Sequence, residues 1–203
     1  MIQQYGLQRS GTNAVRAIVE TNYDATVRST GKHDAPAPPD VAAACAVLVS
    51  VRHPASWLIA YHRFRAMKRS DVGLAIDPID TLAPGWLDHW ATMTTAHLCA
   101  ARRHGRWHVV THDRLIRDPE GAARDVGQAL DLSPTRDTLE VYRGRRMRRG
   151  ADGEDVRHLV TDEAFSPGID LARSWSDVLP RPVVRLAESA LTSVSPHMEG
   201  VEP

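Results

Sequence analysis

Short apolar runs alternate along the chain with longer segments in which apolar residues recur every three or four positions. The clearest run covers residues 45–51 (Cys-Ala-Val-Leu-Val-Ser-Val), which is apolar on both faces and has valine at alternate positions. Such a run is typical of a central strand in a parallel sheet, because helices cover both faces of that sheet. Shorter runs over residues 2–5, 23–29 and 107–111 predict three further strands.

Helices are predicted where apolar residues keep a spacing of three and four. In the first helix, Val15, Ile18 and Val19 share one face. The predicted helices cover residues 14–20, 56–68, 86–103, 119–130, 134–142 and 180–194. Prolines predict an extended linker over residues 35–39 and a loop over residues 70–84, and a turn is predicted at residues 113–115. Strands that alternate with helices predict an α/β fold in three layers, with a mainly parallel central sheet flanked by helices.

The length of 203 residues suits a single domain. We expect its core to lie within residues 2–132, followed by a basic flexible segment at 143–155 and a C-terminal helix at 180–194. Apolar residues make up 42% and charged residues 25%, which is a globular composition. Lys and Arg together number 25, as do Asp and Glu, so the neutral net charge argues against a nucleic-acid partner.

Two cysteines exclude a disulfide framework, and we expect both Cys45 and Cys99 to be core residues. No apolar run is long enough to span a membrane, and the first residues lack the basic and apolar regions of a secretion signal. The sequence therefore predicts a soluble, cytoplasmic protein without a membrane partner. It does not indicate the oligomeric state.

A glycine-bounded loop between the first strand and the first helix predicts an anion-binding site. In Gly6-Leu-Gln-Arg-Ser-Gly11, glycine permits a tight turn, and the following helix presents free backbone N–H groups. In nucleotide triphosphatases the second glycine is followed by Lys and by Ser or Thr, which hold the phosphates and magnesium. Here those two positions carry Thr12 and Asn13, and the cation lies inside the loop as Arg9. The loop therefore suits an anion better than Mg-ATP, and with the strand pattern it predicts a P-loop-like fold.

The motif Arg9-Ser10-Gly11-Thr12-Asn13 resembles the 5′-phosphosulfate loop of the sulfotransferase family, which reads [Lys/Arg]-Ser-Gly-Thr-[Thr/Asn]. After the apolar run at 45–51, Arg52-His53-Pro54 resembles the family's 3′-phosphate segment, Arg-[Asp/Asn]-Pro. Leu115, Asp118 and Pro119 then match its Leu-x-x-Asp-Pro spacing. The resemblance covers about residues 2–132.

The resemblance implies a sulfotransferase that uses 3′-phosphoadenosine 5′-phosphosulfate (PAPS), which leaves as adenosine 3′,5′-bisphosphate. The acceptor would be a hydroxyl, or less readily an amine, of a small molecule or carbohydrate whose identity the sequence does not indicate. Arg52 would pair with the 3′-phosphate, and Ser56 would replace a family serine whose position here carries Ala60. Arg148-Arg149-Gly150 weakly resembles a family segment that covers the same phosphate, although a solvated loop explains it equally well. The implied cofactor-binding residues are Arg9, Ser10, Gly11, Thr12, Asn13, Arg52, Ser56, Arg148, Arg149 and Gly150.

The acceptor hydroxyl must lose a proton as it attacks, so the reaction needs a base. His33 follows the second strand in a short motif that ends in Pro36, where this family often places a catalytic histidine. Lys32 would then bridge to the transferred group, and Arg9 would neutralise its charge. A solvated histidine beside a solvated lysine is the alternative interpretation, and His62 and Asp34 are reserve candidates for the base.

No metal site is predicted. His108 and His112, four apart on a strand, would stand roughly 13 Å apart, which is too far for one ion. Trp86, Trp90 and Met93 have the spacing of core residues on a helix, although they could line an acceptor pocket. Two alternatives to a sulfotransferase remain: a P-loop kinase that uses ATP, and a non-catalytic nucleotide-binding module.

Overall fold

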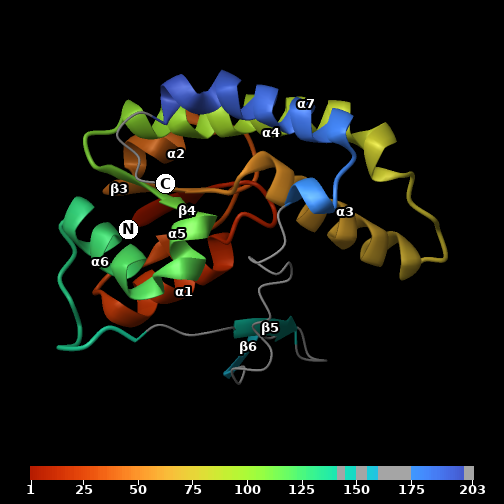
Figure 1. The fold of residues 1–203 in the computed structure, drawn as a ribbon. Helices are drawn as coiled ribbons and strands as arrows, with labels where there is room; N and C mark the ends of the chain where they lie inside the picture. Colours follow the sequence, from red (N-terminus) through yellow and green to blue (C-terminus); the bar gives the residue numbers. More distant parts are fainter. Residues whose placement is uncertain (141–144, 150–154, 160–174, 199–203) are drawn as a thin grey trace.

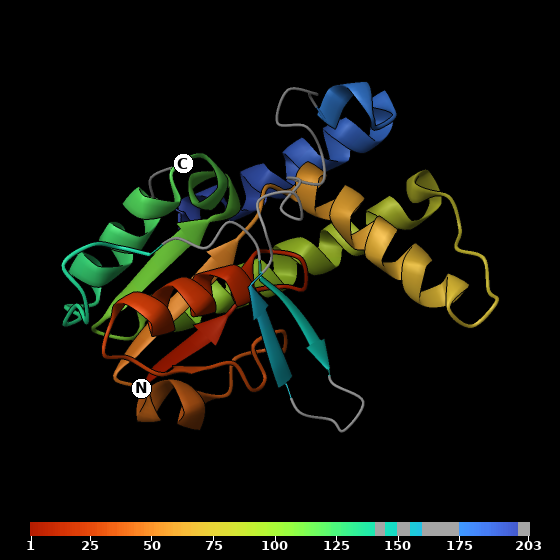
Figure 2. The same ribbon diagram turned by 90° about the horizontal axis from the view of Figure 1, so that it is seen from below.

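The computed structural model describes residues 1–140, 145–149, 155–159 and 175–198. Within these residues the main sheet has four parallel strands in the order β2-β1-β3-β4 (Figure 2). The strands are β1 (Ile2–Tyr5), β2 (Val27–Arg28), β3 (Ala46–Val51) and β4 (Trp107–Thr111). Since all four run in the same direction, their carboxyl ends meet at one edge of the sheet, where ligands bind in open α/β folds.

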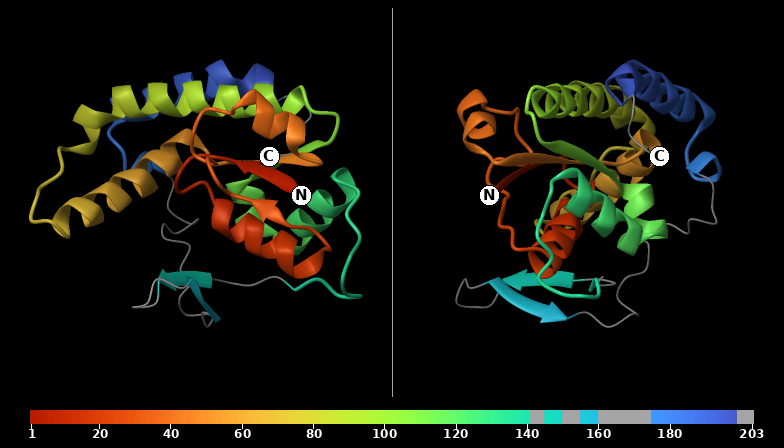
Figure 3. Two further views of the ribbon diagram at one scale, coloured as in Figure 1. Left: turned by 180° about the vertical axis from the view of Figure 1, so that it is seen from behind. Right: turned by 90° about the vertical axis from the view of Figure 1, so that its left-hand side faces the viewer.

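Helices cover both faces of the sheet (Figure 1). On one face lie α1 (Thr12–Asn22), α5 (His112–Arg117) and α6 (Pro119–Ala129). On the other lie α2 (Pro38–Ala43), α4 (Ile79–Arg102) and α7 (Arg181–Val194), with α7 packed along α4. Helix α3 (Pro54–Ser70) packs on α4 and α7 and extends past the sheet (Figure 3). This arrangement confirms the predicted α/β class and is compatible with a three-layer P-loop-like fold.

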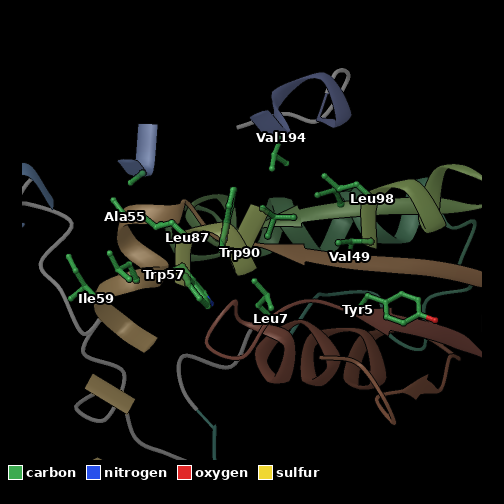
Figure 4. Close-up of a cluster of buried hydrophobic side chains, with 14 of the residues drawn as sticks. Tyr5, Leu7, Val49, Ala55, Trp57, Ile59, Leu87, Trp90, Leu98 and Val194 are labelled. Carbon is green, nitrogen blue, oxygen red and sulfur yellow. The ribbon is translucent and has the colours of Figure 1, made fainter. Parts of the chain in front are cut away.

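The two faces of β3 belong to two separate hydrophobic clusters, which explains why this strand is apolar throughout. Val47, Val49 and Val51 pack with residues of α3, α4 and α7 (Figure 4). Ala46 and Leu48 point the other way and pack with residues of α1 and α6. Because successive side chains of a strand alternate between faces, a strand covered on both sides must be apolar at nearly every position.

Two segments that prolines predicted to be non-helical are partly helical in the structure. The predicted linker at residues 35–39 overlaps α2, which begins at Pro38. Proline fits the first turn of a helix, since no backbone N–H is needed there. The predicted loop at residues 70–84 overlaps α4, which begins at Ile79 and contains Pro84. Pro84 lies near the exposed start of α4, so the one carbonyl that it leaves without a helical partner, that of Asp80, is close to solvent.

The predicted helix over residues 134–142 is wrong for its described part, which is irregular. The buried side chain of Asn22 holds this segment: its Nδ2 donates to Glu140 O (2.8 Å) and its Oδ1 accepts from Glu140 N (2.6 Å). The backbone N–H of Thr135 also donates to Asn22 O. These bonds replace those that a helix would make.

Other predicted boundaries also differ from the structure. The strand predicted at 23–29 shortens to β2, because the backbone at Tyr23 pairs with Pro134 and Asp24 N donates to Ser133 O, outside the main sheet. The predicted turn at 113–115 is helix α5, whose first turn is capped by Thr111 Oγ1.

Cys45 precedes β3 and is exposed, and Cys99 is only partly buried. The expected burial of both cysteines in the core is therefore wrong.

The C-terminal part keeps the predicted helix as α7, between the 3₁₀ turns Trp175–Asp177 and Ser195–His197. The basic segment at 143–155 contains β5 (Arg145–Arg149), which pairs antiparallel with β6 (Asp155–Leu159). Within the described residues, no helix combines the length and apolar character needed to cross a bilayer.

Candidate anion site at the carboxyl edge of the sheet

The loop between β1 and α1 has an unusual backbone that presses against the end of β3. Gly6 and Gly11 have positive φ angles of 149° and 87°, and Arg9 has one of 71°. A Cβ on Gly6 would stand 2.6 Å from the backbone oxygen of Ser50. A positive φ at a residue other than glycine costs about 1 kcal/mol or more, and such strain is retained mainly where a site needs it.

Replacing Gly6 with alanine is expected to destabilise the protein by about 2–4 kcal/mol, because the new methyl group collides with backbone at an unfavourable φ. The free energy of unfolding from urea denaturation measures the effect. Gly105→Ala is the matched control, since a Cβ there meets nothing within 4 Å. Equal stability of the Gly6 and Gly105 variants would contradict the close approach.

Helix α1 begins directly after this loop, with Gly11 as its N-cap. Gly11 has no side chain to cap the helix, so the first backbone N–H groups remain available for an anion. Thr12 is buried, whereas Asn13 is exposed and its Oδ1 accepts a hydrogen bond from Lys32 Nζ (2.5 Å). An ammonium group therefore lies beside the helix start. Burial lowers the pKa of Lys32, and the nearby charge of Arg16 lowers it further.

Arg52 extends from the end of β3 to the same loop. Its Nη1 donates to Arg9 O (3.1 Å) and its Nε donates to Ser56 Oγ (2.8 Å). The side chain predicted to bind the 3′-phosphate is thus in contact with the loop, with Ser56 as its neighbour. Burial lowers the pKa of Arg52 to about 10, helped by Arg9 and opposed by Asp113, so Arg52 stays charged at neutral pH. Ala60, one helical turn beyond Ser56, is partly buried.

Two buried tryptophans hold this arrangement from behind. Trp57 Nε1 donates to Gln8 O in the loop (2.8 Å), and Trp90 Nε1 donates to Arg52 O (3.1 Å). Each indole is 1% exposed, so Trp90 is a core residue, as its spacing predicted. The Arg9 guanidinium lies over the Phe64 ring, 5.7 Å from its centroid, within the range of a cation–π contact.

The turn that carries Lys32 and His33 is bonded to the loop at Gly6. The Gly6 N–H donates to Lys32 O (2.9 Å), and His33 Nδ1 donates to Gly6 O (2.5 Å). Since Nδ1 holds the proton in this bond, Nε2 of the neutral ring carries a lone pair. Burial lowers the pKa of His33 and the Lys32 charge adds to this effect, against the opposing Gly6 bond and Asp34 charge. His33 is therefore neutral at pH 7.

His97 supports this turn from α4, a role that the sequence did not reveal. Its Nε2 donates to Asp34 O (2.9 Å), and its ring stacks on Tyr5 with centroids 5.4 Å apart. The side chain is only 1% exposed. The available signal was a histidine on the otherwise apolar face of a long helix, which must find a hydrogen-bond partner when buried.

His112 and Asp113 are further site residues that the sequence interpretation missed. They directly follow β4, whose carboxyl end meets those of β1 and β3, and this position was the signal. A Cβ on Gly11 would lie 3.4 Å from His112 Cδ2, so the imidazole lies beside the loop. Burial lowers the pKa of His112, and Arg52 and Arg9 lower it further while Asp113 opposes them.

His53, next to Arg52, is another polar residue at this edge of the sheet. Its Nδ1 accepts from Ala55 N and so caps α3, and its ring stacks on Trp175 with centroids 4.9 Å apart. Burial lowers the pKa of His53, opposed by the charges of Asp113 and Glu188.

Some predicted residues lie elsewhere or outside the description. His62 Nε2 donates to Asp77 O, between α3 and α4, and not at the loop. Arg148 and Arg149 belong to β5, and Gly150 lies outside the described residues. His112 begins α5 and does not extend β4, so the strand spacing assumed for His108 and His112 does not apply.

The site combines the cations Arg9, Arg52 and Lys32 with uncapped helical N–H groups and a neutral histidine. Such a set can bind a multiply charged anion and accept a proton next to it. In the described part of the chain, no group of three or more His, Cys, Asp or Glu side chains could hold a metal ion. Comparison with models of known protein families found no match to this chain, and comparison with curated proteins found none.

Proposed function

We propose that this protein is a PAPS-dependent sulfotransferase that acts on a hydroxyl group of a small molecule or carbohydrate. The observation that carries the proposal is that the Lys32–His33 turn and Arg52 are both hydrogen-bonded to the β1–α1 loop. Gly6 bonds to both Lys32 and His33, and Arg52 bonds to the carbonyl of Arg9. The anion loop, the second cation and the base thus lie within one network. Two unpaired cysteines fit a reducing compartment, so we extend the proposal to a cytoplasmic enzyme.

The residues present fit a phosphosulfate group. Gly6 and Gly11 let the backbone approach closely, Arg9 supplies a planar cation, and the helix start supplies N–H donors. Arg52, with Ser56 beside it, would hold the 3′-phosphate. Bound PAPS supplies an activated sulfuryl group. The chain's contribution is to hold that group in line with the acceptor and to neutralise the charge on its oxygens.

His33 would remove the acceptor proton. His33 Nε2 would take the proton that the acceptor hydroxyl loses as its oxygen takes the sulfuryl group, and adenosine 3′,5′-bisphosphate would be the leaving group. The Nδ1–H bond to Gly6 O fixes this tautomer, so that the lone pair lies on the correct nitrogen before the acceptor binds. Lys32 is bonded to Asn13 at the start of α1, where it would bridge to the transferred group.

Ligand preference is the first test of the proposal. Isothermal titration should show that adenosine 3′,5′-bisphosphate binds without magnesium, at least about tenfold more tightly than Mg-ATP, a difference of about 1.4 kcal/mol. The physical reason is the second cation, Arg52, together with the lack of a lysine and a hydroxyl after Gly11.

Two outcomes would favour the alternatives. Preference for Mg-ATP would indicate a P-loop kinase. Binding of the bisphosphate without sulfation of any member of a panel of hydroxylated acceptors would indicate a non-catalytic nucleotide-binding module.

A further inference from the structure

We propose that His112 is an additional anion-binding residue of this site and that it takes up a proton when a phosphate- or sulfate-bearing ligand binds. The inference rests on the proposed function only in taking the β1–α1 loop as the anion site. It assigns a role to a side chain that the transfer reaction described above does not use.

The geometry places His112 against the loop from the β4 side. Its Cδ2 lies 3.4 Å from the Cβ position of Gly11, the residue that precedes the first N–H groups of α1. The side chain is 17% exposed and comes from the start of α5, directly after β4, whereas His33 comes from the segment after β2. In the strand order β2 and β4 lie on opposite sides of the β1–β3 pair, so the two histidines reach the loop from different ends of the sheet.

The groups around His112 Nδ1 would stabilise a proton on this nitrogen once an anion has bound. Nδ1 is buried without a hydrogen-bond partner among the described residues, and Asp113 Oδ1 lies 3.9 Å away. A buried polar atom without a partner is uncommon and requires an explanation. A protonated Nδ1 would face the Asp113 carboxylate, which gives the imidazolium a counter-charge.

The charges around His112 explain why protonation must wait for the ligand. Arg9 from the loop and Arg52 from the end of β3 lower its pKa, in addition to burial, while Asp113 raises it. An anionic ligand bound between these arginines neutralises their charge and adds an attraction for the imidazolium, so the pKa of His112 rises on binding. Between its free and bound pKa values His112 is neutral in the free protein and protonated in the complex. The affinity for the anion therefore falls as the pH rises through this interval.

Calorimetry measures the proton directly. Adenosine 3′,5′-bisphosphate is titrated into the protein near pH 6.5, in two buffers that differ in ionisation enthalpy. The difference between the two binding enthalpies then gives the number of protons that the complex takes up. The phosphates of the ligand also titrate near this pH. The quantity of interest is therefore the difference between wild type and His112→Gln. We expect the variant to lose most of one proton of uptake per site and to bind about tenfold more weakly at pH 6, with little change at pH 8.5.

Controls separate this role from general damage. His89→Gln removes an exposed histidine of α4 and should keep the wild-type proton count. Asp113→Asn removes the counter-charge without touching the imidazole and should also reduce uptake, which keeps the test valid if His112→Gln does not fold. Equal proton uptake and equal pH dependence in wild type and the His112 or Asp113 variant would overturn the inference.

Inorganic sulfate is the second probe, since it stays dianionic across this pH range. Its affinity should fall from pH 6 to pH 8.5 more steeply in wild type than in His112→Gln, because His33 and His53 are present in both proteins. This result would support the His112 role even if PAPS supported no transfer, so failure of the two proposals can be told apart. Lack of binding by both probes would overturn the inference.

Discussion

Replacing Arg9 with glutamine should lower kcat for sulfuryl transfer by about a hundred- to a thousandfold, the usual cost of removing one donor to a developing negative charge. Arg9 is exposed at the loop, its guanidinium lies over the Phe64 ring, and its backbone carbonyl accepts a hydrogen bond from Arg52. Glutamine has the same Cβ, so the substitution adds no strain at the positive φ of this position. Release of adenosine 3′,5′-bisphosphate from PAPS, with an acceptor that the wild type sulfates, measures the effect.

Arg65→Gln is the matched control, because it removes an exposed arginine of α3 outside the loop network. It should keep the wild-type rate. The melting temperature of Arg9→Gln should equal that of wild type, since the loop is held by the indole of Trp57 and by Arg52 through the Arg9 backbone. A rate equal to that of wild type in Arg9→Gln would remove Arg9 from the proposed chemistry.

Replacing His33 with glutamine should lower kcat by about 10²–10⁴-fold, the usual contribution of a positioned general base. Affinity for adenosine 3′,5′-bisphosphate should change much less, because His33 faces the acceptor side in this proposal. The pH profile is the more specific measurement. The base must be neutral, and its pKa lies below the ordinary value of a histidine, so kcat/KM should rise with pH below about 6.5 and be level at pH 7.

In His33→Gln this acid limb should disappear along with most of the activity. His62→Gln is the control, since His62 lies between α3 and α4 and bonds to Asp77 O. If His62→Gln lost the activity while His33→Gln kept it, the role of base would move to His62, the reserve candidate.

Local sequence patterns were sufficient where the structure depends on neighbours along the chain. The apolar run of β3 and the spacing of Val15, Ile18 and Val19 in α1 reflect burial of a strand on two faces and of a helix on one. The glycines of the first loop likewise reflect backbone angles that few other residues adopt.

Local patterns failed where a partner distant in the sequence decides the outcome. Residues 134–140 are irregular because the Asn22 amide takes the backbone bonds of Glu140, 118 positions away. Cys45, whose N–H donates to Met1 O, lies just before β3 and is exposed. The support of the Lys32–His33 turn by His97, through a bond to Asp34 63 positions away, could not be read from any single segment.

The sequence by itself determined the α/β class and the place of the glycine-bounded loop between the first strand and the first helix, because each depends on side-chain chemistry and short spacing. Only the tertiary structure decided which residues meet at this loop. The parallel strand order β2-β1-β3-β4 brings the ends of four strands to one edge, so that Gly6 bonds to His33, Arg52 bonds to Arg9 and His112 lies beside Gly11. Strand order follows from packing over the whole chain, and for that reason neither His112 nor His97 was selected from the sequence.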